Sequence, residues 1–266
     1  MSSRRSRWTV LSLLVAMAVA VTVGLNVVTS HHGASGPTCQ TTAGSSSYTL
    51  DLEQAANATT VAAVGKRLGL PDHAVTVALA AALQESRLRN LSYGDLDSRG
   101  LFQQRPSQGW GTSSQIMVPS YAAGAFYEHL ALVPGWQDKA VTDAAQSVQR
   151  SAAPSAYAQW ESEARVLAQA LTGEVPAGLV CRFRNGAGTP LSSELSAAMT
   201  TELGSGAMGV SLPPARGWTV AAWLVGHASR YRIPSVVFAG QRWTAARGTW
   251  EPDSLAGPDV QITSGA

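Results

Sequence analysis

The sequence predicts a mainly α-helical domain followed by a small α+β domain, both behind a hydrophobic N-terminal helix. Three observations support this fold class: a long uncharged apolar run near the N-terminus, helical periodicity through the middle of the chain, and mixed helix and strand signals beyond it. We expect a membrane or signal helix in residues 1–30, a linker in 31–50, the α domain in 51–173, a second linker in 174–190, the α+β domain in 191–256 and a tail in 257–266.

The N-terminal segment predicts export from the cytoplasm. Three arginines within the first seven residues precede Trp8–Val28, a run of 21 residues without a charge. This length is close to the roughly 20 residues that span a bilayer and exceeds the roughly 7–15 residues of a signal-peptide core. Positive charge before the run favours a cytoplasmic tip with the rest of the chain outside. We expect an anchor in the cytoplasmic membrane, while Ala16, Ala18 and Ala20 leave cleavage by a signal peptidase open.

The α domain is predicted from hydrophobic periodicity. Val61, Val64 and Leu68 share one helix face, and Gly69 and Pro71 interrupt the pattern. The sequence after Pro71 is almost wholly apolar for about three turns. We therefore expect a first helix that contains Val61, Val64 and Leu68, and further helices over about 72–89, 120–132, 142–150 and 155–172, with a turn-rich loop over 90–119 and a C-cap at Gly173.

The C-terminal region shows a different pattern. A short helix is expected near 192–203 and a longer one near 218–231. The stretch SVVFAGQRWTAA then contains two short β-like runs, with a turn at Ala239-Gly240. These signals predict the small α+β domain.

The composition excludes some classes of function. Hydrophobic residues make up 45% and charged residues 14% of the chain, which suits a globular core. The net charge is +2, and the seventeen arginines and two lysines form no basic stripe. We therefore expect no nucleic-acid partner. The five histidines and two cysteines show no metal-ligand spacing, so we expect no metal and no cofactor.

The two cysteines, Cys39 and Cys181, predict one disulfide. An even number of cysteines in an exported chain favours pairing, because compartments outside the cytoplasm are oxidising. Such a bond would join the segment before the α domain to the segment just after it. Two free buried thiols are the alternative.

Glu85 is the candidate proton donor. It lies late in a helix whose preceding residues, VTVALAAALQ, carry no charge. Apolar surroundings raise the pKa of a carboxyl group because burial disfavours the ionised form. A carboxylic acid that is protonated near neutral pH can donate the proton that cleavage of a glycosidic bond requires. The alternative is a helix-end glutamate paired with Arg87 or Arg89.

The segment after Glu85 carries a resemblance. Glu85-Ser86, the acidic turn YGDLDSR and then Gly100-Leu101-Phe102-Gln103 resemble the lysozyme-like lytic transglycosylases and goose-type lysozymes. A stretch like GLFQQRPSQGWG also resembles exported actinobacterial proteins of this type. The resemblance covers about 120 residues and implies a lysozyme-like α domain. It also implies that Glu85 is the catalytic acid, with Ser86 beside it in the substrate site.

The segment RGLFQQRPSQGWG, residues 99–111, is predicted to line a groove for a sugar polymer. The amides of Gln103 and Gln104 can donate to and accept from sugar hydroxyl and N-acetyl groups. Phe102 and Trp110 offer flat faces for the C–H faces of sugar rings. A structural turn with Phe102 and Trp110 in the core is the alternative, although loops of this length are uncommon unless they are functional.

A second carboxylate would decide between hydrolysis and transglycosylation. Hydrolases need a second acidic residue as nucleophile or base. By resemblance to goose-type lysozymes, Asp97 is the favoured candidate, and Asp95 and Asp97 as turn formers are the alternative. The resemblance to lytic transglycosylases implies a different arrangement. Those enzymes need only one catalytic glutamate, which acts first as acid and then as base.

The third motif of these families departs from its usual form. In place of an Ala-Tyr-Asn-like sequence, this chain reads QSVQRSAAPSAYAQW. Tyr157 or Gln149 is expected to take the place of the tyrosine, with Tyr157 as a core residue of a helical stripe as the alternative.

Two functions follow from these residues. One is an exported enzyme that cleaves the glycan strands of peptidoglycan, as a lytic transglycosylase or a muramidase, with Glu85 as general acid and base. The imperfect third motif motivates the alternative, a catalytically inactive lysozyme-like protein that binds the cell wall or acts as a scaffold. Both place the protein in the cell envelope outside the cytoplasm, in contact with peptidoglycan and, through the N-terminal helix, with the cytoplasmic membrane.

Overall fold

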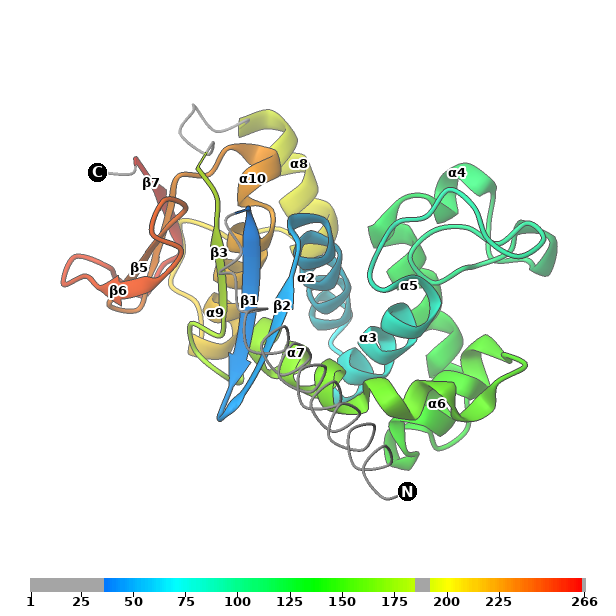
Figure 1. Cartoon of the computed structure of the whole chain (residues 1–266). Coiled ribbons are helices and arrows are strands. Elements are labelled where there is room, and N and C mark those ends of the chain that lie inside the picture. Colours follow the sequence, from blue (N-terminus) through cyan, green and yellow to red (C-terminus); the bar gives the residue numbers. More distant parts are fainter. Residues whose placement is uncertain (1–35, 185–191, 265–266) are drawn as a thin grey trace, which may run out of the picture. The chain divides into compact units, whose positions relative to one another are not determined.

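A computed structural model describes residues 36–184 and 192–264 of the chain (Figure 1). The predicted membrane or signal helix in residues 1–30 lies outside the described residues. Within the two described ranges, no helix is both long and apolar enough to cross a bilayer. The chain from Pro37 onward forms one compact unit, and its described part contains nine α-helices and seven short strands.

The two predicted linkers contribute strands instead. Strands β1 (Thr38–Ala43) and β2 (Ser46–Leu50) form a hairpin within the predicted linker 31–50, and β3 (Leu179–Arg182) lies within the predicted linker 174–190. The three strands form an antiparallel sheet in the order β2-β1-β3. Alternate residues of β1 are buried, so one face of this Ser- and Thr-rich strand packs on the core. The linker prediction was wrong because strand pairing between distant segments leaves little trace in sequence.

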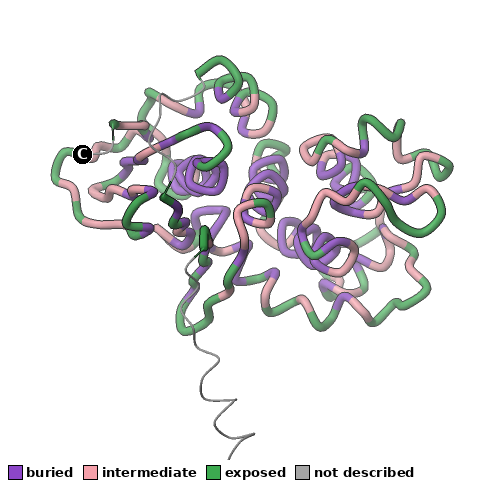
Figure 2. The backbone as a smooth tube through the Cα atoms, turned by 45° about the horizontal axis from the view of Figure 1, so that its top comes forward, coloured by how far each residue is buried: buried purple, intermediate pink, exposed green. Residues whose placement is uncertain are grey.

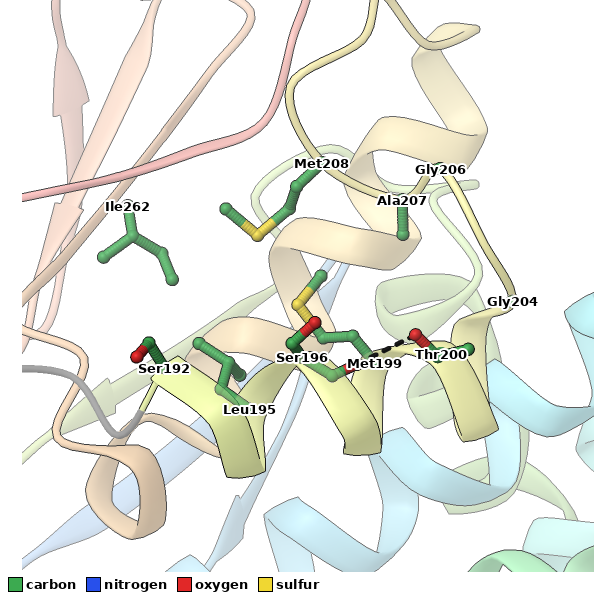
Figure 3. Close-up of a pocket in the computed structure, with 10 residues that line it drawn as sticks. All are labelled: Ser192, Leu195, Ser196, Met199, Thr200, Gly204, Gly206, Ala207, Met208 and Ile262. Atoms are coloured by element: carbon green, nitrogen blue, oxygen red, sulfur yellow. Dashed lines mark hydrogen bonds between the residues drawn. The ribbon is translucent and has the colours of Figure 1, made fainter.

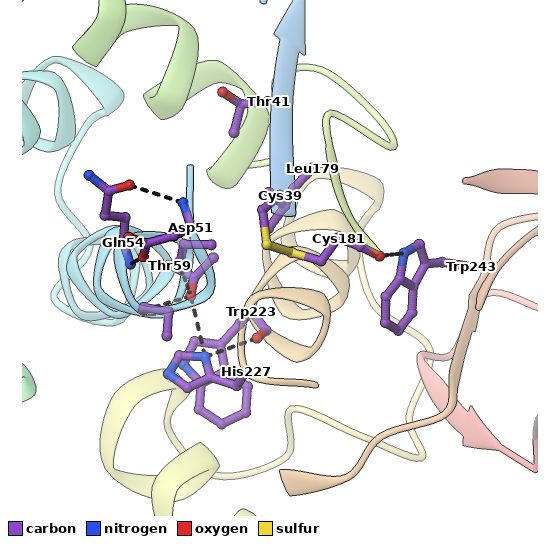
Figure 4. Close-up of a disulfide and its surroundings, with 12 residues drawn as sticks. Cys39, Thr41, Asp51, Gln54, Thr59, Leu179, Cys181, Trp223, His227 and Trp243 are labelled. Carbon is purple, nitrogen blue, oxygen red and sulfur yellow. Dashed lines mark hydrogen bonds between the residues drawn. A yellow bond between two sulfur atoms is a disulfide. The ribbon is translucent and has the colours of Figure 1, made fainter. Parts of the chain in front are cut away.

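The predicted disulfide is present. Cys39 of β1 and Cys181 of β3 are register partners in the sheet, and their sulfur atoms are bonded. Both side chains are buried, and Trp243 Nε1 donates a hydrogen bond to the carbonyl oxygen of Cys181 at 3.1 Å (Figure 4). The disulfide therefore joins two residues that are 142 positions apart, closes a loop that contains the α domain and ties it to the C-terminal region.

Two adjacent helices form the centre of the unit. Helix α2 (Leu52–Arg67) begins at a capping box in which the Asp51 carboxylate accepts from the backbone N–H of Gln54. Helix α3 (Asp72–Ser86) is buried along most of its length, as its apolar sequence predicts. Figure 2 shows the buried backbone concentrated in these central helices. Both predicted helices are confirmed, with α3 ending three residues earlier than expected.

The remaining α-domain helices also match the prediction closely. The turn-rich loop contains only the short helices η1 and α4. The helix expected over 155–172 begins as a 3-10 helix and continues as α7. The elements are η1 (Pro106–Gln108), α4 (Ser113–Ile116), α5 (Pro119–Ala131), η2 (Trp136–Asp138), α6 (Val141–Gln149), η3 (Pro154–Trp160) and α7 (Glu161–Leu171). Gly173 follows α7 with φ of 80°, the left-handed conformation of a helix-ending glycine.

The C-terminal region is α+β, as predicted. Its helices are α8 (Ser192–Leu203), α9 (Pro214–Gly226) and α10 (Ala228–Tyr231), so the expected helix 218–231 begins earlier and is interrupted at His227. Its strands are β4 (Ser235–Phe238), β5 (Gln241–Thr244), β6 (Trp250–Pro252) and β7 (Gln261–Thr263), in the antiparallel order β6-β5-β4-β7. The hairpin at Ala239-Gly240 is confirmed. The predicted tail 257–266 contains β7, which pairs with β4 and so joins this segment to the sheet.

Helix α2 joins the α domain to the C-terminal region. It packs against α5 on one side and α9 on the other. A Cβ at Gly226 would come within 2.7 Å of Thr59, so the close approach of α9 to α2 requires glycine there. His227 lies buried at this contact between Thr59 and Thr60, at 3.3 Å from each hydroxyl, and burial lowers the pKa of its imidazole. The two predicted domains therefore share a core, where the sequence suggested separate units.

Candidate functional site

Glu85 lies in the last turn of α3, at a well-defined helix end. The two residues that end the helix, Arg87 and Leu88, both adopt left-handed backbone conformations, with φ of 56° and 61°. Such conformations are strained for residues other than glycine and persist where neighbours hold them. Here Gln54 Nε2 and Asn57 Nδ2 of α2 donate to the carbonyl oxygens of Arg87 and Leu88, at 3.0 and 2.7 Å. Helix α2 thereby fixes the turn that directly follows Glu85.

The Glu85 carboxyl group is partly buried and has one specific partner. The hydroxyl of Tyr157, in η3, donates a hydrogen bond to Glu85 Oε1 at 2.7 Å. Burial raises the pKa of Glu85 above its ordinary value, and the hydrogen bond from Tyr157 opposes this in part. The Tyr157 ring is itself fully buried. Tyr157 is therefore both a core residue and the hydrogen-bond partner of the candidate acid. The sequence had offered a core position and a position in the site as alternatives.

The alternative role of Glu85, a helix-end ion pair, is not observed. The guanidinium group of Arg87 lies over the ring of Trp160, 3.9 Å from its centroid. Arg89 forms its ion pairs with Asp51 and Glu53 of the α2 start. Neither arginine pairs with Glu85 among the described contacts, so the carboxyl group lacks the cation that would lower its pKa.

Three residues predicted to bind substrate are structural instead. Ser86 is buried, and its Oγ donates to the Leu101 carbonyl oxygen at 2.7 Å. Phe102 is buried and stacks on Phe126, with ring centroids 4.8 Å apart. Gln104 is buried, and its Nε2 donates to the Ala122 carbonyl oxygen at 3.0 Å. These predictions were wrong because the three side chains anchor the 99–111 segment to the core and to α3.

Two other residues of the same segment line a cavity of about 490 Å³, Gln103 and Trp110. Gln103 has a left-handed backbone, with φ of 48°, between the buried Phe102 and Gln104. Its Nε2 donates to the carbonyl oxygens of Tyr93 and Gly100, at 3.3 and 3.2 Å. The Trp110 ring stacks on His129 of α5, with ring centroids 3.9 Å apart. Gln103 and Trp110 are thus the predicted binding residues that the structure brings to a common concavity.

The far wall of this cavity comes from the end of α6. Gln149 Nε2 donates to the Phe102 carbonyl oxygen at 3.1 Å, which connects α6 to the 99–111 segment. Gln149 and the adjacent Arg150 both line the cavity. The sequence offered Tyr157 or Gln149 in place of the tyrosine of the third motif. Gln149 lies at the cavity wall, whereas Tyr157 contacts Glu85.

Asp97 lies in an ion pair at the surface. Arg105 Nε donates to Asp97 Oδ1 at 2.9 Å, and the backbone N–H and hydroxyl of Ser107 donate to its two oxygens at 2.8 and 2.9 Å. These hydrogen bonds, first that from Arg105, lower the pKa of Asp97 to about 2. A carboxylate of this pKa is a weak base. The geometry suits a residue that closes the turn from 97 to 107. The sequence had offered this turn-forming role as the alternative to catalysis.

Sequence reasoning missed a group of residues beside Glu85. Trp160 Nε1 donates to Gln84 Oε1 at 2.8 Å, which joins η3 to the last turn of α3. Glu163 of α7 is partly buried, which raises its pKa, while the charge of Arg87 lowers it. The only sequence signal for this group was the helical stripe of Tyr157 and Trp160, because no motif connects such distant residues.

A second cavity, of about 510 Å³, lies between α8, the turn after it and β7 (Figure 3). Leu195, Met199, Met208 and Ile262 give it apolar walls. None of the described residues that line it is titratable. Within the described ranges, no group of three or more His, Cys, Asp or Glu side chains could hold a metal ion.

Neither a protein-family model nor a curated protein matches this chain. The site must therefore be interpreted from its own geometry and from the motif resemblance.

Proposed function

We propose that this protein is an exported lysozyme-like enzyme that cleaves the glycan strands of peptidoglycan, with Glu85 as general acid and base. The observation that carries the proposal is the Glu85 carboxyl group: it is partly buried, its pKa is raised, and it accepts a hydrogen bond from the buried Tyr157. A carboxyl group whose pKa is raised keeps its proton to higher pH than an ordinary glutamate does, and it can donate that proton to a glycosidic oxygen.

The reaction has two steps at this carboxyl group. Protonated Glu85 donates its proton to the glycosidic oxygen while the C1–O bond breaks and its electron pair passes to that oxygen. The Glu85 carboxylate then takes the proton from the C6 hydroxyl of the same sugar as O6 bonds to C1, which closes a 1,6-anhydro ring. Tyr157 holds the carboxyl group in place through both steps and stabilises its ionised form between them.

The state of Asp97 argues against this residue as the second carboxylate of a hydrolase. A hydrolase requires a second carboxylate as nucleophile or base. Asp97 is paired with Arg105 and Ser107 and has a pKa of about 2, so we assign it to the support of the loop. The disulfide between Cys39 and Cys181 is consistent with the expected location outside the cytoplasm, because such bonds persist in oxidising compartments.

Zymography on purified cell wall tests the proposal. The parent protein is expected to clear the wall, and Glu85→Gln is expected not to. Glu194→Gln, which changes an exposed glutamate on α8, is the matched control and is expected to clear like the parent. Mass spectrometry of the released fragments is expected to show anhydro ends, whereas reducing ends would indicate a muramidase. Pelleting with the wall without clearing by any variant would replace the enzyme with the alternative, a non-catalytic wall-binding protein.

A further inference from the structure

The cavity beside the 99–111 segment has a chemical character that a neutral glycan does not explain. Among the described residues that line it are two arginines, Arg105 and Arg150, and no acidic residue. Arg105 is partly neutralised because its Nε donates to Asp97. Arg150 is exposed, and in the described part of the chain its side chain has no hydrogen-bond or ion-pair partner. The cavity thus presents a net positive charge with one guanidinium group available to a ligand.

The other groups of the cavity suit a peptide. Gln108 and Gln149 offer side-chain amides, which can pair with the N–H and C=O groups of a peptide chain. Trp110, Leu132 and Val148 add apolar surface for small side chains such as that of alanine. The volume of about 490 Å³ falls within the usual range for a small-ligand site.

The cavity is connected to the environment of Glu85 on both walls. The 99–111 segment, which forms one wall, is held to the end of α3 by the bond from Ser86 Oγ to the Leu101 carbonyl oxygen. On the α6 side, Gln146 Nε2 donates to the Ser151 carbonyl oxygen at 2.8 Å, and Ser151 in turn hydrogen-bonds Tyr157. These bonds join both walls of the cavity to the elements that carry Glu85 and Tyr157.

We propose that the cavity binds a carboxylate of the peptide stem that branches from the glycan, with Arg150 as its ionic contact. This inference rests on the proposed function, because peptidoglycan is the glycan that carries short peptides with free carboxylates. Arg150 then determines specificity: it distinguishes glycan that bears peptides from a bare N-acetylated sugar polymer. The guanidinium fork suits a carboxylate because it donates two parallel hydrogen bonds.

Calorimetry on the Glu85→Gln protein, which is expected not to turn over its ligand, tests this inference. The probes are a disaccharide–peptide fragment of peptidoglycan, the same disaccharide without its peptide, and inorganic phosphate. We expect the peptide-bearing fragment to bind at least about tenfold more tightly than the bare disaccharide. Adding Arg150→Asn is expected to weaken binding of the peptide-bearing fragment by about fivefold to tenfold and to leave the bare disaccharide unaffected.

Arg232→Asn is the matched control. Arg232 is also an exposed arginine at a helix end, with φ of 56° beside 51° for Arg150, and asparagine tolerates this conformation. It lies outside the residues that line the cavity. We expect Arg232→Asn to bind both fragments like the background protein. Equal losses from the two arginine substitutions would overturn the inference.

The outcomes separate this inference from the proposed function. Equal binding of both fragments, in a protein whose parent still clears cell wall through Glu85, would reject the peptide site and leave the enzyme standing. Binding that depends on Arg150 and on the peptide, in a protein that clears no wall, would support the site and reject the enzyme. Displacement of the peptide-bearing fragment by phosphate at equal concentration would overturn the assignment to a peptide carboxylate.

Discussion

Glu85 and Asp97 flank the same short segment of chain, yet their carboxyl groups are in opposite physical states. Glu85 is partly enclosed by α3 and η3 and pairs with no cation in the described part of the chain. Its pKa is raised because burial disfavours its charge. Asp97 is at the surface, where an arginine and a serine stabilise its charge and lower its pKa to about 2. The first state suits a group that exchanges protons, and the second suits a group that holds a turn.

The different surroundings of the two carboxyl groups account for their opposite pKa shifts. Both residues are acidic and both are near the 99–111 segment, so the sequence made each a candidate for catalysis. Burial raises the pKa of Glu85, and the hydroxyl of Tyr157 opposes this only in part, whereas a guanidinium and a backbone N–H lower the pKa of Asp97. Substitutions that exchange or remove these partners therefore test the comparison directly.

The largest effect is expected from Glu85→Gln on turnover. Loss of a general acid typically lowers the rate by about 100-fold to 10,000-fold. We expect a decrease in this range in the initial rate of wall solubilisation, with the Glu194→Gln control unchanged. A Glu85→Gln protein that retains a tenth or more of the parent rate would assign the chemistry to another residue.

Tyr157→Phe is expected to have an intermediate effect. The hydroxyl of Tyr157 holds down the pKa of Glu85, so its removal raises that pKa further and weakens the positioning of the carboxyl group. We expect a rate lower by about tenfold, and an alkaline limb of the pH–rate profile that moves to higher pH. A purely structural role would lower the rate without moving that limb, which would argue against the contact with Glu85.

The stability of Glu85→Gln should depend on pH. In the folded parent the pKa of Glu85 lies above its ordinary value of 4.5, so ionisation costs folded-state free energy as pH rises through and beyond 4.5. At pH 7 we expect the free energy of unfolding of Glu85→Gln to exceed that of the parent by about 0.5–2 kcal/mol, so the variant is the more stable protein. The gain should shrink toward zero below pH 4.5, as denaturant titrations at several pH values would reveal. A constant difference at all pH values would mean that Glu85 is not destabilised when ionised.

Asp97→Asn is expected to have the smallest effect on activity. If Asp97 only closes the turn, the rate should fall by less than about threefold. Because its pKa is lowered from 3.8 to about 2, its contribution to stability is present above pH 3.8 and is lost as pH falls toward 2. A rate loss as large as that of Glu85→Gln would restore Asp97 as a catalytic group and favour the muramidase reaction.

The sequence predicted the helical part of this fold better than its strands. Helix α8 was predicted at its observed bounds, and α5 and α6 within one residue at each end, because each repeats apolar residues at local spacing. The sheet of β1, β2 and β3 was missed, since it pairs Ser- and Thr-rich segments that are far apart in the chain. Cys39 and Cys181 were the one signal that connected those segments, and their pairing was predicted.

The sequence indicated the environment of some candidate residues and not of others. The partly buried carboxyl group of Glu85 could be expected because this acid follows a long apolar run, and its catalytic role stays a prediction. The roles of Phe102, Gln103 and Gln104 could not be assigned, since one left-handed residue, Gln103, turns its neighbours toward the core. The hydrogen bond between Tyr157 and Glu85 depends on the packing of η3 against α3, which periodicity does not reveal.

A direct test of the central claim is an NMR titration of carboxyl-labelled protein, in which Glu85 and Asp97 are assigned by their substitutions. We predict that the Glu85 carboxyl group titrates above 4.5 and the Asp97 carboxyl group at about 2. A Glu85 carboxyl group that titrates at or below 4.5 would contradict the account, because it would be ionised at the pH where a proton donor is needed.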